Sequence, residues 1–136
     1  MTPIEIYREW QRCLGANDHE GTARVVDLEG YTEICLGLTD WTTGYSVALP
    51  NFYKNMIAPW SDMTFTEQDI NESKDAVTVR NRVEATHTGE FLGVAPTGRR
   101  VSWDHVAIVK LKDGRVVGQW AQPDLWGIHC QLTAAV

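Results

Sequence analysis

The chain has 136 residues, of which 43% are hydrophobic, and a formal net charge of −6 at pH 7. This length fits one domain with one core, and we expect residues 1–136 to form it. An acidic chain with scattered Lys and Arg residues lacks the basic surface that nucleic-acid phosphates or anionic membranes attract, so neither is an expected partner.

The cysteines and the N-terminal segment bear on the cellular compartment. Three cysteines, an odd number without CxxC spacing, suit a reducing cytoplasm. The first residues lack the apolar stretch of a signal peptide, and no apolar run is long enough to span a bilayer. We therefore expect a soluble cytoplasmic protein. The histidines and cysteines have no zinc or haem spacing, so no metal is predicted.

Helical periodicity marks the first part of the sequence. Apolar residues recur every three or four positions from Ile4 to Leu14 behind Thr2-Pro3, which favours a capped amphipathic helix. This helix should end at Asn17-Asp18, and a second short helix is expected over residues 19–27.

The following segment, YTEICLGL, indicates a strand, and the Thr, Asp and Gly residues over 39–44 indicate a loop. A third helix is expected within residues 45–57. Pro50 must occupy the first turn of that helix or break it, because proline has no backbone N–H.

From Met63 onward polar and apolar residues alternate, which is typical of strands. Two long strands are predicted with a turn within Asn71 to Asp75, and a loop over residues 93–100 leads to a final hairpin. Helices followed by antiparallel strands predict an α+β fold, in which the helices pack across the concave face of a strongly curved antiparallel sheet. The space between the layers is a natural ligand pocket.

The turn of the last hairpin decides which side chains share a face. A two-residue loop, Asp113-Gly114, would place His105 opposite Gln122. A three-residue loop that includes Lys112 would place His105 opposite Ala121. We favour the second register, in which one face carries Trp103, His105, Ala107, Val109 and Leu111 with Val117, Gln119 and Ala121.

The second half of the chain contains TGEF at 88–91, PTGRR at 96–100, DG at 113–114 and a terminal helix over Leu125 to Leu132. In this order and spacing the motifs resemble the SnoaL-like polyketide cyclases of the nuclear transport factor two-like superfamily. The N-terminal half is similar only in its helix pattern. The resemblance implies a cone-shaped fold with a deep apolar pocket, no cofactor and a homodimer.

In the aldol cyclases of that family, an Asp near the end of the last strand acts as acid and base, aided by two polar residues on the preceding strand. Transferred to this sequence, the Asp position falls on Ala121 and the other two on His105 and Ala107. The missing carboxylate weakens a cyclase assignment. His105 is the candidate catalytic residue because imidazole transfers protons near neutral pH; the alternative is a core histidine bonded to the backbone.

Six further residues are candidates for binding a flat aromatic ligand by stacking or hydrogen bonding: Trp41, Phe52, His87, Phe91, Trp103 and Gln119. Each also has a structural interpretation, which is core packing for the aromatic residues and His87 and surface exposure for Gln119. Asp104 is expected on the opposite face as an ion-paired carboxylate, and Asp124 as the N-cap of the last helix.

The leading hypothesis is an enzyme that hydroxylates an anthracycline-type aromatic polyketide with molecular oxygen, without metal or flavin. The resemblance implies this activity, and an electron-rich dihydroquinone is able to pass electrons to oxygen itself. A separate reductase would then supply the reduced ring. Two alternatives stay open, an intramolecular aldol condensation and a non-catalytic carrier of an aromatic ligand.

Overall fold

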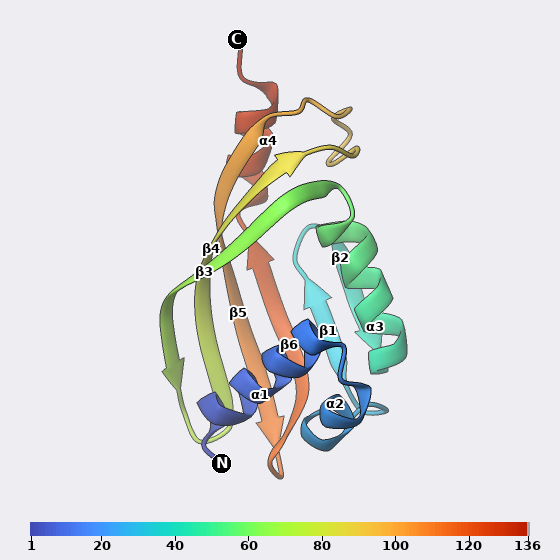
Figure 1. The fold of residues 1–136 in the computed structure, drawn as a ribbon, viewed down its shortest axis with the longest axis vertical. Helices are drawn as coiled ribbons and strands as arrows, with labels where there is room; N and C mark the ends of the chain where they lie inside the picture. Colours follow the sequence, from blue (N-terminus) through green and yellow to red (C-terminus); the bar gives the residue numbers. More distant parts are fainter. Residues whose placement is uncertain (136) are drawn as a thin grey trace.

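A strongly curved six-stranded sheet with helices on its concave side makes up the computed structural model, which describes residues 1–135 (Figure 1). The strand order is β2-β1-β6-β5-β4-β3. The strands are β1 (Thr32–Cys35), β2 (Thr39–Thr43), β3 (Trp60–Glu72), β4 (Ala76–His87), β5 (Arg100–Lys112) and β6 (Arg115–Pro123). The predicted α+β fold with a curved sheet is therefore confirmed.

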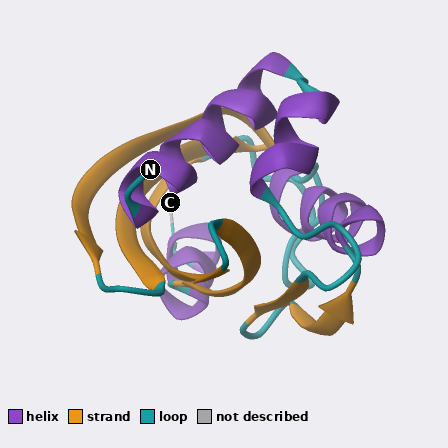
Figure 2. Cartoon of the chain, turned by 90° about the horizontal axis from the view of Figure 1, so that it is seen from below, coloured by secondary structure: helices purple, strands orange, loops and turns teal. Residues whose placement is uncertain are grey.

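The helices are α1 (Pro3–Ala16), α2 (His19–Val25), α3 (Tyr45–Phe52) and α4 (Leu125–Thr133), with a π-helical turn η1 (Tyr53–Ile57) after α3. Seen end-on, the sheet curls so far that α1 and α4 lie on the inside of the bend (Figure 2). Within the described residues, no helix is both long and apolar enough to cross a membrane.

The predicted start and end of α1 are confirmed. Thr2 and Glu5 form a reciprocal capping box, in which each side chain accepts a hydrogen bond from the other residue's backbone N–H. Asn17 closes the helix in the left-handed conformation, with φ of 55°. Together these contacts satisfy backbone groups that a helix end leaves free.

Pro50 lies inside α3, so the expectation that it occupies the first turn or breaks the helix is wrong. The helix continues to Phe52 and widens directly into η1, where the N–H of Ala58 bonds to the carbonyl of Tyr53 at 2.8 Å. A wider π turn is one of the ways in which a helix accommodates a disturbed hydrogen-bond ladder.

Two expectations for the β1 region are corrected. Residues 39–43 form β2 rather than a loop, because the threonines, which favour extended backbone, pair antiparallel with β1. The sheet is also mixed rather than antiparallel, since β1 runs parallel to β6. The four-residue β1 thereby extends the curved sheet beyond the final hairpin.

The register of the last hairpin differs from both predicted alternatives. Asp113 and Gly114, with φ of 51° and 76°, form a two-residue turn that pairs Lys112 with Arg115. Val117 is then bulged out, because Leu111 pairs with Val116 while Lys110 pairs with Gly118. His105 consequently lies opposite Pro123 rather than Ala121 or Gln122.

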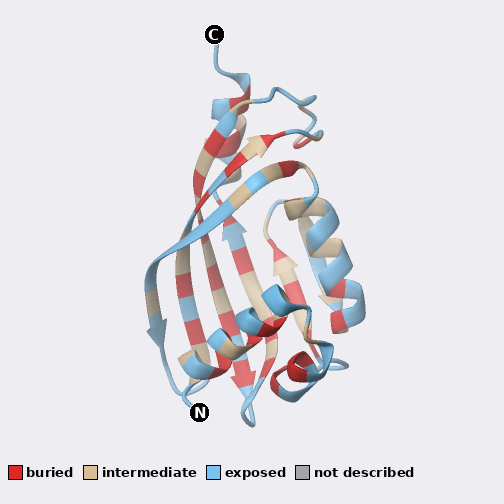
Figure 3. Ribbon diagram, in the orientation of Figure 1, coloured by how far each residue is buried: buried red, intermediate tan, exposed pale blue. Residues whose placement is uncertain are grey.

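The bulge restores the predicted grouping of side chains, except at Val117. Alternate residues of β5, from Val101 to Leu111, are buried on the concave side, which appears as alternating red bands in Figure 3. Gln119 and Ala121 share that side through their pairing with Val109 and Ala107. Val117 instead lines a hollow on the convex side.

Two apolar clusters fill the concave side. The lower cluster gathers around α1, α2 and β1 and includes Trp10, Tyr31, Tyr45, Val77 and Val109. The upper cluster gathers around η1 and α4 and includes Trp60, Phe91, Trp103, Ile128 and Leu132. The side chains of the functional site lie between and beside these clusters.

Gly118 is expected to be essential for the parallel junction of β1 and β6. A Cβ atom at this position would overlap the carbonyl oxygen of Thr32. Gly118→Ala should therefore push β1 away and lower the free energy of unfolding by about 1–3 kcal/mol, measured by urea denaturation. Gly15→Ala, where a Cβ meets no atom within 4 Å, should be neutral or slightly stabilising. Equal stability of the two variants would contradict this account.

Candidate functional site

The concave face of β4, β5, β6 and β1 is organised in rows of paired residues that point to the same side. Three consecutive rows matter for the site, and we name each by one member. The histidine row contains Asn81, His105 and Pro123. The alanine row contains Val79, Ala107, Ala121 and Cys35, and the glutamate row contains Val77, Val109, Gln119 and Glu33.

His105 is a buried imidazole without a protein partner. The residue is only 6% exposed, yet neither ring nitrogen makes a hydrogen bond within residues 1–135, and Nδ1 is fully shielded from solvent. Burial lowers the pKa of His105 to about 4, so the ring is neutral at pH 7. The alternative of a core histidine bonded to the backbone is not what the structure shows.

Small side chains lie next to His105 on the concave face. Ala107 follows it on the same face of β5 and pairs with Ala121 on β6. Ala107 is 6% exposed and Ala121 is fully buried, and both belong to the lower cluster. The alanine row is therefore packed in the same cluster as Trp10 and Tyr45.

Asn81 and Tyr7 add polar atoms beside the histidine. Asn81 pairs directly with His105, and Tyr7 projects from α1 towards the Asn81 amide. Burial raises the pKa of the Tyr7 hydroxyl, while the nearby Asn81 amide acts in the opposite direction. The histidine row is thus the polar band between two apolar parts of the concave face.

A second polar group, which the sequence analysis missed, occupies the glutamate row. Glu33 is 7% exposed, and its Oε1 accepts hydrogen bonds from the Tyr31 hydroxyl at 2.6 Å and from Gln119 Nε2 at 3.0 Å. Burial raises the pKa of Glu33. The alternation of Tyr31, Glu33 and Cys35 was the available signal, because it places Glu33 on the face of two residue types that are often buried.

Four of the residues proposed for ligand binding belong to the upper cluster. Phe91 and Trp103 are buried there, and Phe52 packs against it. His87 is fully buried against Trp60, with ring centroids 5.3 Å apart. These side chains form a wall at the end of the concave face nearest His105, because Trp103 is two residues away on β5.

Several buried nitrogens of this wall lack a partner within the described residues: Trp60 Nε1, Trp103 Nε1 and His87 Nε2. The backbone N–H of Thr97 donates to His87 Nδ1 at 3.1 Å, so in the neutral ring the proton resides on Nε2. All three are therefore N–H donors without an acceptor.

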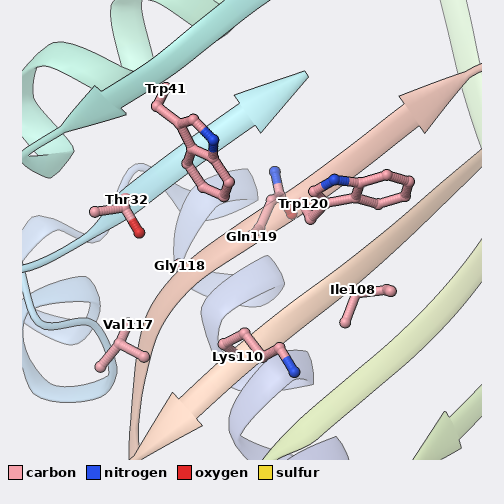
Figure 4. Close-up of a pocket in the computed structure, with 8 residues that line it drawn as sticks. All are labelled: Thr32, Trp41, Ile108, Lys110, Val117, Gly118, Gln119 and Trp120. Carbon is pink, nitrogen blue, oxygen red and sulfur yellow. The ribbon is translucent and has the colours of Figure 1, made fainter. Parts of the chain in front are cut away.

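Trp41 lies on the opposite side of the sheet. It is 58% exposed and lines a hollow of about 490 Å³ on the convex face, together with Thr32, Ile108, Lys110, Val117, Gly118, Gln119 and Trp120 (Figure 4). Trp41 therefore does not share a surface with His105. The amide of Gln119 donates to Glu33, so its role towards a ligand is indirect.

The two aspartates close to the site have structural surroundings. Asp104 forms ion pairs with Arg80 and Arg82, each at 3.1 Å, which agrees with the expected surface carboxylate. Asp124 accepts a hydrogen bond from the N–H of Gly127 at 2.9 Å and is the N-cap of α4, as predicted.

Comparison with known proteins agrees with this fold. A family model described as SnoaL-like polyketide cyclase matches residues 6–132. Aklanonic acid methyl ester cyclase AcmA of Streptomyces galilaeus is 33% identical over 79 residues. That match covers 54% of this chain and 55% of AcmA, so it spans about half the length of the relative.

Solved structures resemble the whole chain. A proposed SnoaL-like polyketide cyclase from Jannaschia sp. CCS1 superimposes with a TM-score of 0.81 at 21% identity, covering 98% of this chain and 93% of the other. AclR of Streptomyces galilaeus, a proposed hydroxylase, has a TM-score of 0.74 at 24% identity, with 98% and 97% covered. IdmH of Streptomyces antibioticus, a proposed polyketide cyclase, has a TM-score of 0.74 at 25% identity, with 97% and 99% covered. These likenesses bear on the fold.

The neutral, buried state of His105 predicts a specific pH dependence of stability. An unfolded histidine binds a proton below pH 6.5, whereas folded His105 does so only near pH 4. The unfolded state thus binds more protons between these values, and stability falls as pH falls, by about 3 kcal/mol from this residue. Chemical denaturation at pH 7 and pH 4 should show a smaller loss of unfolding free energy for His105→Asn than for the parent protein. Parallel losses in both proteins would contradict the assignment.

Proposed function

Because the chain belongs to the SnoaL-like polyketide cyclase family, we propose that it hydroxylates a ring of an anthracycline-type aromatic polyketide with molecular oxygen, without metal or flavin. The observation that carries the proposal is the pairing of a free, buried imidazole with a carboxylate-free alanine row. The reaction needs an apolar binding surface and a proton-transfer group, and the apolar side chains of the concave face and His105 would supply them.

The chemistry balances without a protein-bound redox group. A dihydroquinone substrate loses its two hydroxyl hydrogens, the ring C–H becomes C–OH, and the two oxygen atoms of O₂ end in that hydroxyl and in one water. Four electrons pass to O₂, two from the dihydroquinone and two from the ring carbon. A separate reductase would supply the reduced ring.

His105 would serve as the proton-transfer residue of this reaction. The neutral imidazole has one nitrogen that accepts a proton and one that donates. It would take the proton of a ring hydroxyl, which raises the electron density of the ring before oxygen adds. The wall that contains Trp103 and Phe91 would stack against the fused rings and exclude bulk water.

An intramolecular aldol condensation is the second candidate. The buried carboxyl of Glu33 favours it, because an aldol closure needs both an acid and a base. The similarity to the cyclase AcmA over half of the chain favours it as well. A non-catalytic carrier of an aromatic ligand is then an outcome of the test rather than a separate proposal.

The assay that separates these functions is aerobic incubation of an anthraquinone-type polyketide, supplied both oxidised and chemically reduced, followed by mass spectrometry. Hydroxylation predicts a product one oxygen atom heavier, labelled when the oxygen gas is isotopically labelled. An isomer with a new ring would identify a cyclase instead. Binding without any product would identify a carrier.

His105→Ala should lower the hydroxylation rate by about 10²–10⁴-fold, the usual contribution of a proton-transfer residue. Binding of the oxidised anthraquinone, followed by quenching of tryptophan fluorescence, should remain within a few fold of the parent protein. His129→Ala, at a half-buried α4 residue that stacks on the exposed Trp126, is the matched control. Full turnover in His105→Ala would remove this residue from the mechanism.

We also propose that the convex face is covered by a second copy of the chain. In the described part of the chain no helix packs on this side, and an exposed tryptophan, Trp41, lines an apolar hollow of about 490 Å³. A protruding group next to a recess on one surface allows a two-fold symmetric, self-complementary interface. The homodimer implied by the family resemblance would then leave both concave faces free.

Trp41→Glu should convert the dimer into a monomer in sedimentation velocity experiments, because it would bury a carboxylate in an apolar interface. Trp126→Glu replaces another exposed tryptophan, 75% exposed on α4, and should leave the dimer intact. A Trp41→Glu protein that sediments as the parent does would place the interface elsewhere or exclude a dimer.

A further inference from the structure

We propose that His87 is a pH-sensitive switch, which keeps the loop over residues 88–99 closed on the upper cluster and releases it when the imidazole takes up a proton. This loop joins β4 to β5 at the upper end of the molecule, where Arg99 Nη1 donates to the Gln131 carbonyl of α4 at 2.8 Å (Figure 1). The release would occur in the protein alone, so it does not depend on which reaction the site performs.

The middle of the loop has few attachments to the rest of the protein. In the described part of the chain, the hydrogen bonds of residues 90–96 stay inside that segment, and two of them join Phe91 and Val94 through their backbones. The contact with the core is apolar, because the Phe91 ring, 3% exposed, packs on Trp60 with ring centroids 5.1 Å apart. A segment held in this way opens as a unit once one of its ends is released.

The two ends of the loop are attached differently. At its start, the N–H groups of Thr88 and Gly89 both donate to the Pro59 carbonyl, at 3.1 and 2.8 Å, and no titratable group takes part. At its far end, the N–H of Thr97 donates to His87 Nδ1 at 3.1 Å, and the next N–H along the chain donates to the His87 carbonyl at 2.9 Å. The far end is therefore fastened to His87, and one of its two bonds depends on the charge of the ring.

Protonation of His87 removes the acceptor that the Thr97 N–H uses. Nδ1 of the neutral ring has a lone pair, whereas both nitrogens of the imidazolium carry hydrogen, so the Thr97 N–H would face another N–H. The charged ring is still able to donate to the Thr97 hydroxyl, 3.0 Å from Nδ1, which already accepts the N–H of Arg99 at 3.2 Å. The Thr97 N–H, however, has no other acceptor among residues 1–135. One proton thus leaves a backbone donor of the loop without a partner.

The closed loop also lies over donors that have no acceptor. His87 Nε2, Trp60 Nε1 and Trp103 Nε1 are shielded from solvent and unpaired within the described residues. Their rings gather around Trp60, whose centroid is 5.3 Å from that of His87 and 4.8 Å from that of Trp103. Each unmet donor favours a form in which water reaches it. Closure is therefore a balance of opposing contributions, and the loss of one bond is enough to shift it.

The groups around the ring set the direction of the pH dependence. Burial lowers the pKa of His87, and a backbone contact and the Glu90 carboxylate offset this only in part. Trp60 of β3 and Thr97 of the loop do not titrate in this range, and the Arg99 guanidinium is bonded to α4. An open loop would return the ring to water and its pKa towards 6.5. The closed form binds the proton more weakly, so it loses stability as the pH falls below about 6.5.

A nitrogen-15 NMR titration of the whole chain from pH 8 to pH 5 tests this switch. The ring signals of His87 should show the proton on Nε2 at pH 8 and a single midpoint below pH 6.5. The amide signals of Phe91 and Thr97 should move with the same midpoint. The protection of the Thr97 amide against hydrogen exchange, corrected for the intrinsic effect of pH, should fall by about tenfold or more. Loop amides that do not respond while His87 titrates, or a His87 ring that does not titrate above pH 5, would overturn the proposal.

His87→Asn is the diagnostic variant, because the side-chain oxygen of Asn accepts a hydrogen bond close to the position of Nδ1 but does not titrate. The Thr97 amide should then stay protected at pH 5. His19→Asn, at an exposed histidine of α2, is the matched control and should keep the pH response of the parent protein. A His87→Asn loop that opens on acidification as the parent's does would assign the response to another group.

Thr97→Pro supplies the opposite case and does not alter the buried ring. Proline has no N–H to donate to Nδ1, so the loop should be released at every pH. At pH 8 the Phe91 amide of this variant should have the exchange rate that the parent protein reaches at pH 5, after the same correction. A Phe91 amide as protected as that of the parent at pH 8 would show that the bond to His87 does not hold the loop.

Discussion

The pleat of the β5–β6 hairpin is the constraint on which the site depends. In a strand, a shift of one residue moves every side chain to the other face. The two-residue turn at Asp113-Gly114 would by itself send Gln119 and Ala121 to the convex side and bring Trp120 inside. The bulge at Val117 reverses this shift. Three features follow from that one extra residue: the alanine row, the hydrogen bond from Gln119 to Glu33, and the position of Trp120 on the convex face.

This constraint explains which parts of the site could be predicted. The turn residues were compatible with two registers, and the favoured register was wrong. Its assignment of side chains to faces holds except at Val117, because the observed pairing differs from the favoured one by two residues, which is an even number. The alternation of polar and apolar residues shows only which residues of a strand share a face, and not which residues they pair with. A bulge changes both register and parity, and Val117 carries no residue type, such as glycine, that would have marked it.

The helices and the capping residues were predictable because their signals are local. Thr2, Asn17 and Asp124 act within a few residues of their own position. Glu33 was missed for the opposite reason. Its burial results from the parallel pairing of a four-residue strand with β6, and Gln119 lies 86 residues later in the chain. The local alternation of Tyr31, Glu33 and Cys35 indicates which face Glu33 shares but not this long-range contact.

The concave face combines two costs that a purely structural sheet would avoid. An unpartnered imidazole and a half-partnered carboxyl group are both taken out of water, and each loses solvation that the protein returns only in part. Leucine or valine in these two positions would fill the same space with apolar contacts. The protein instead keeps an imidazole and a carboxyl group on the two sides of the alanine row. Burial shifts the pKa of each group towards its uncharged form, which limits the charge that the apolar layer must hold. Two such groups lower the stability of the sheet, which is the cost expected of side chains kept for function rather than for packing.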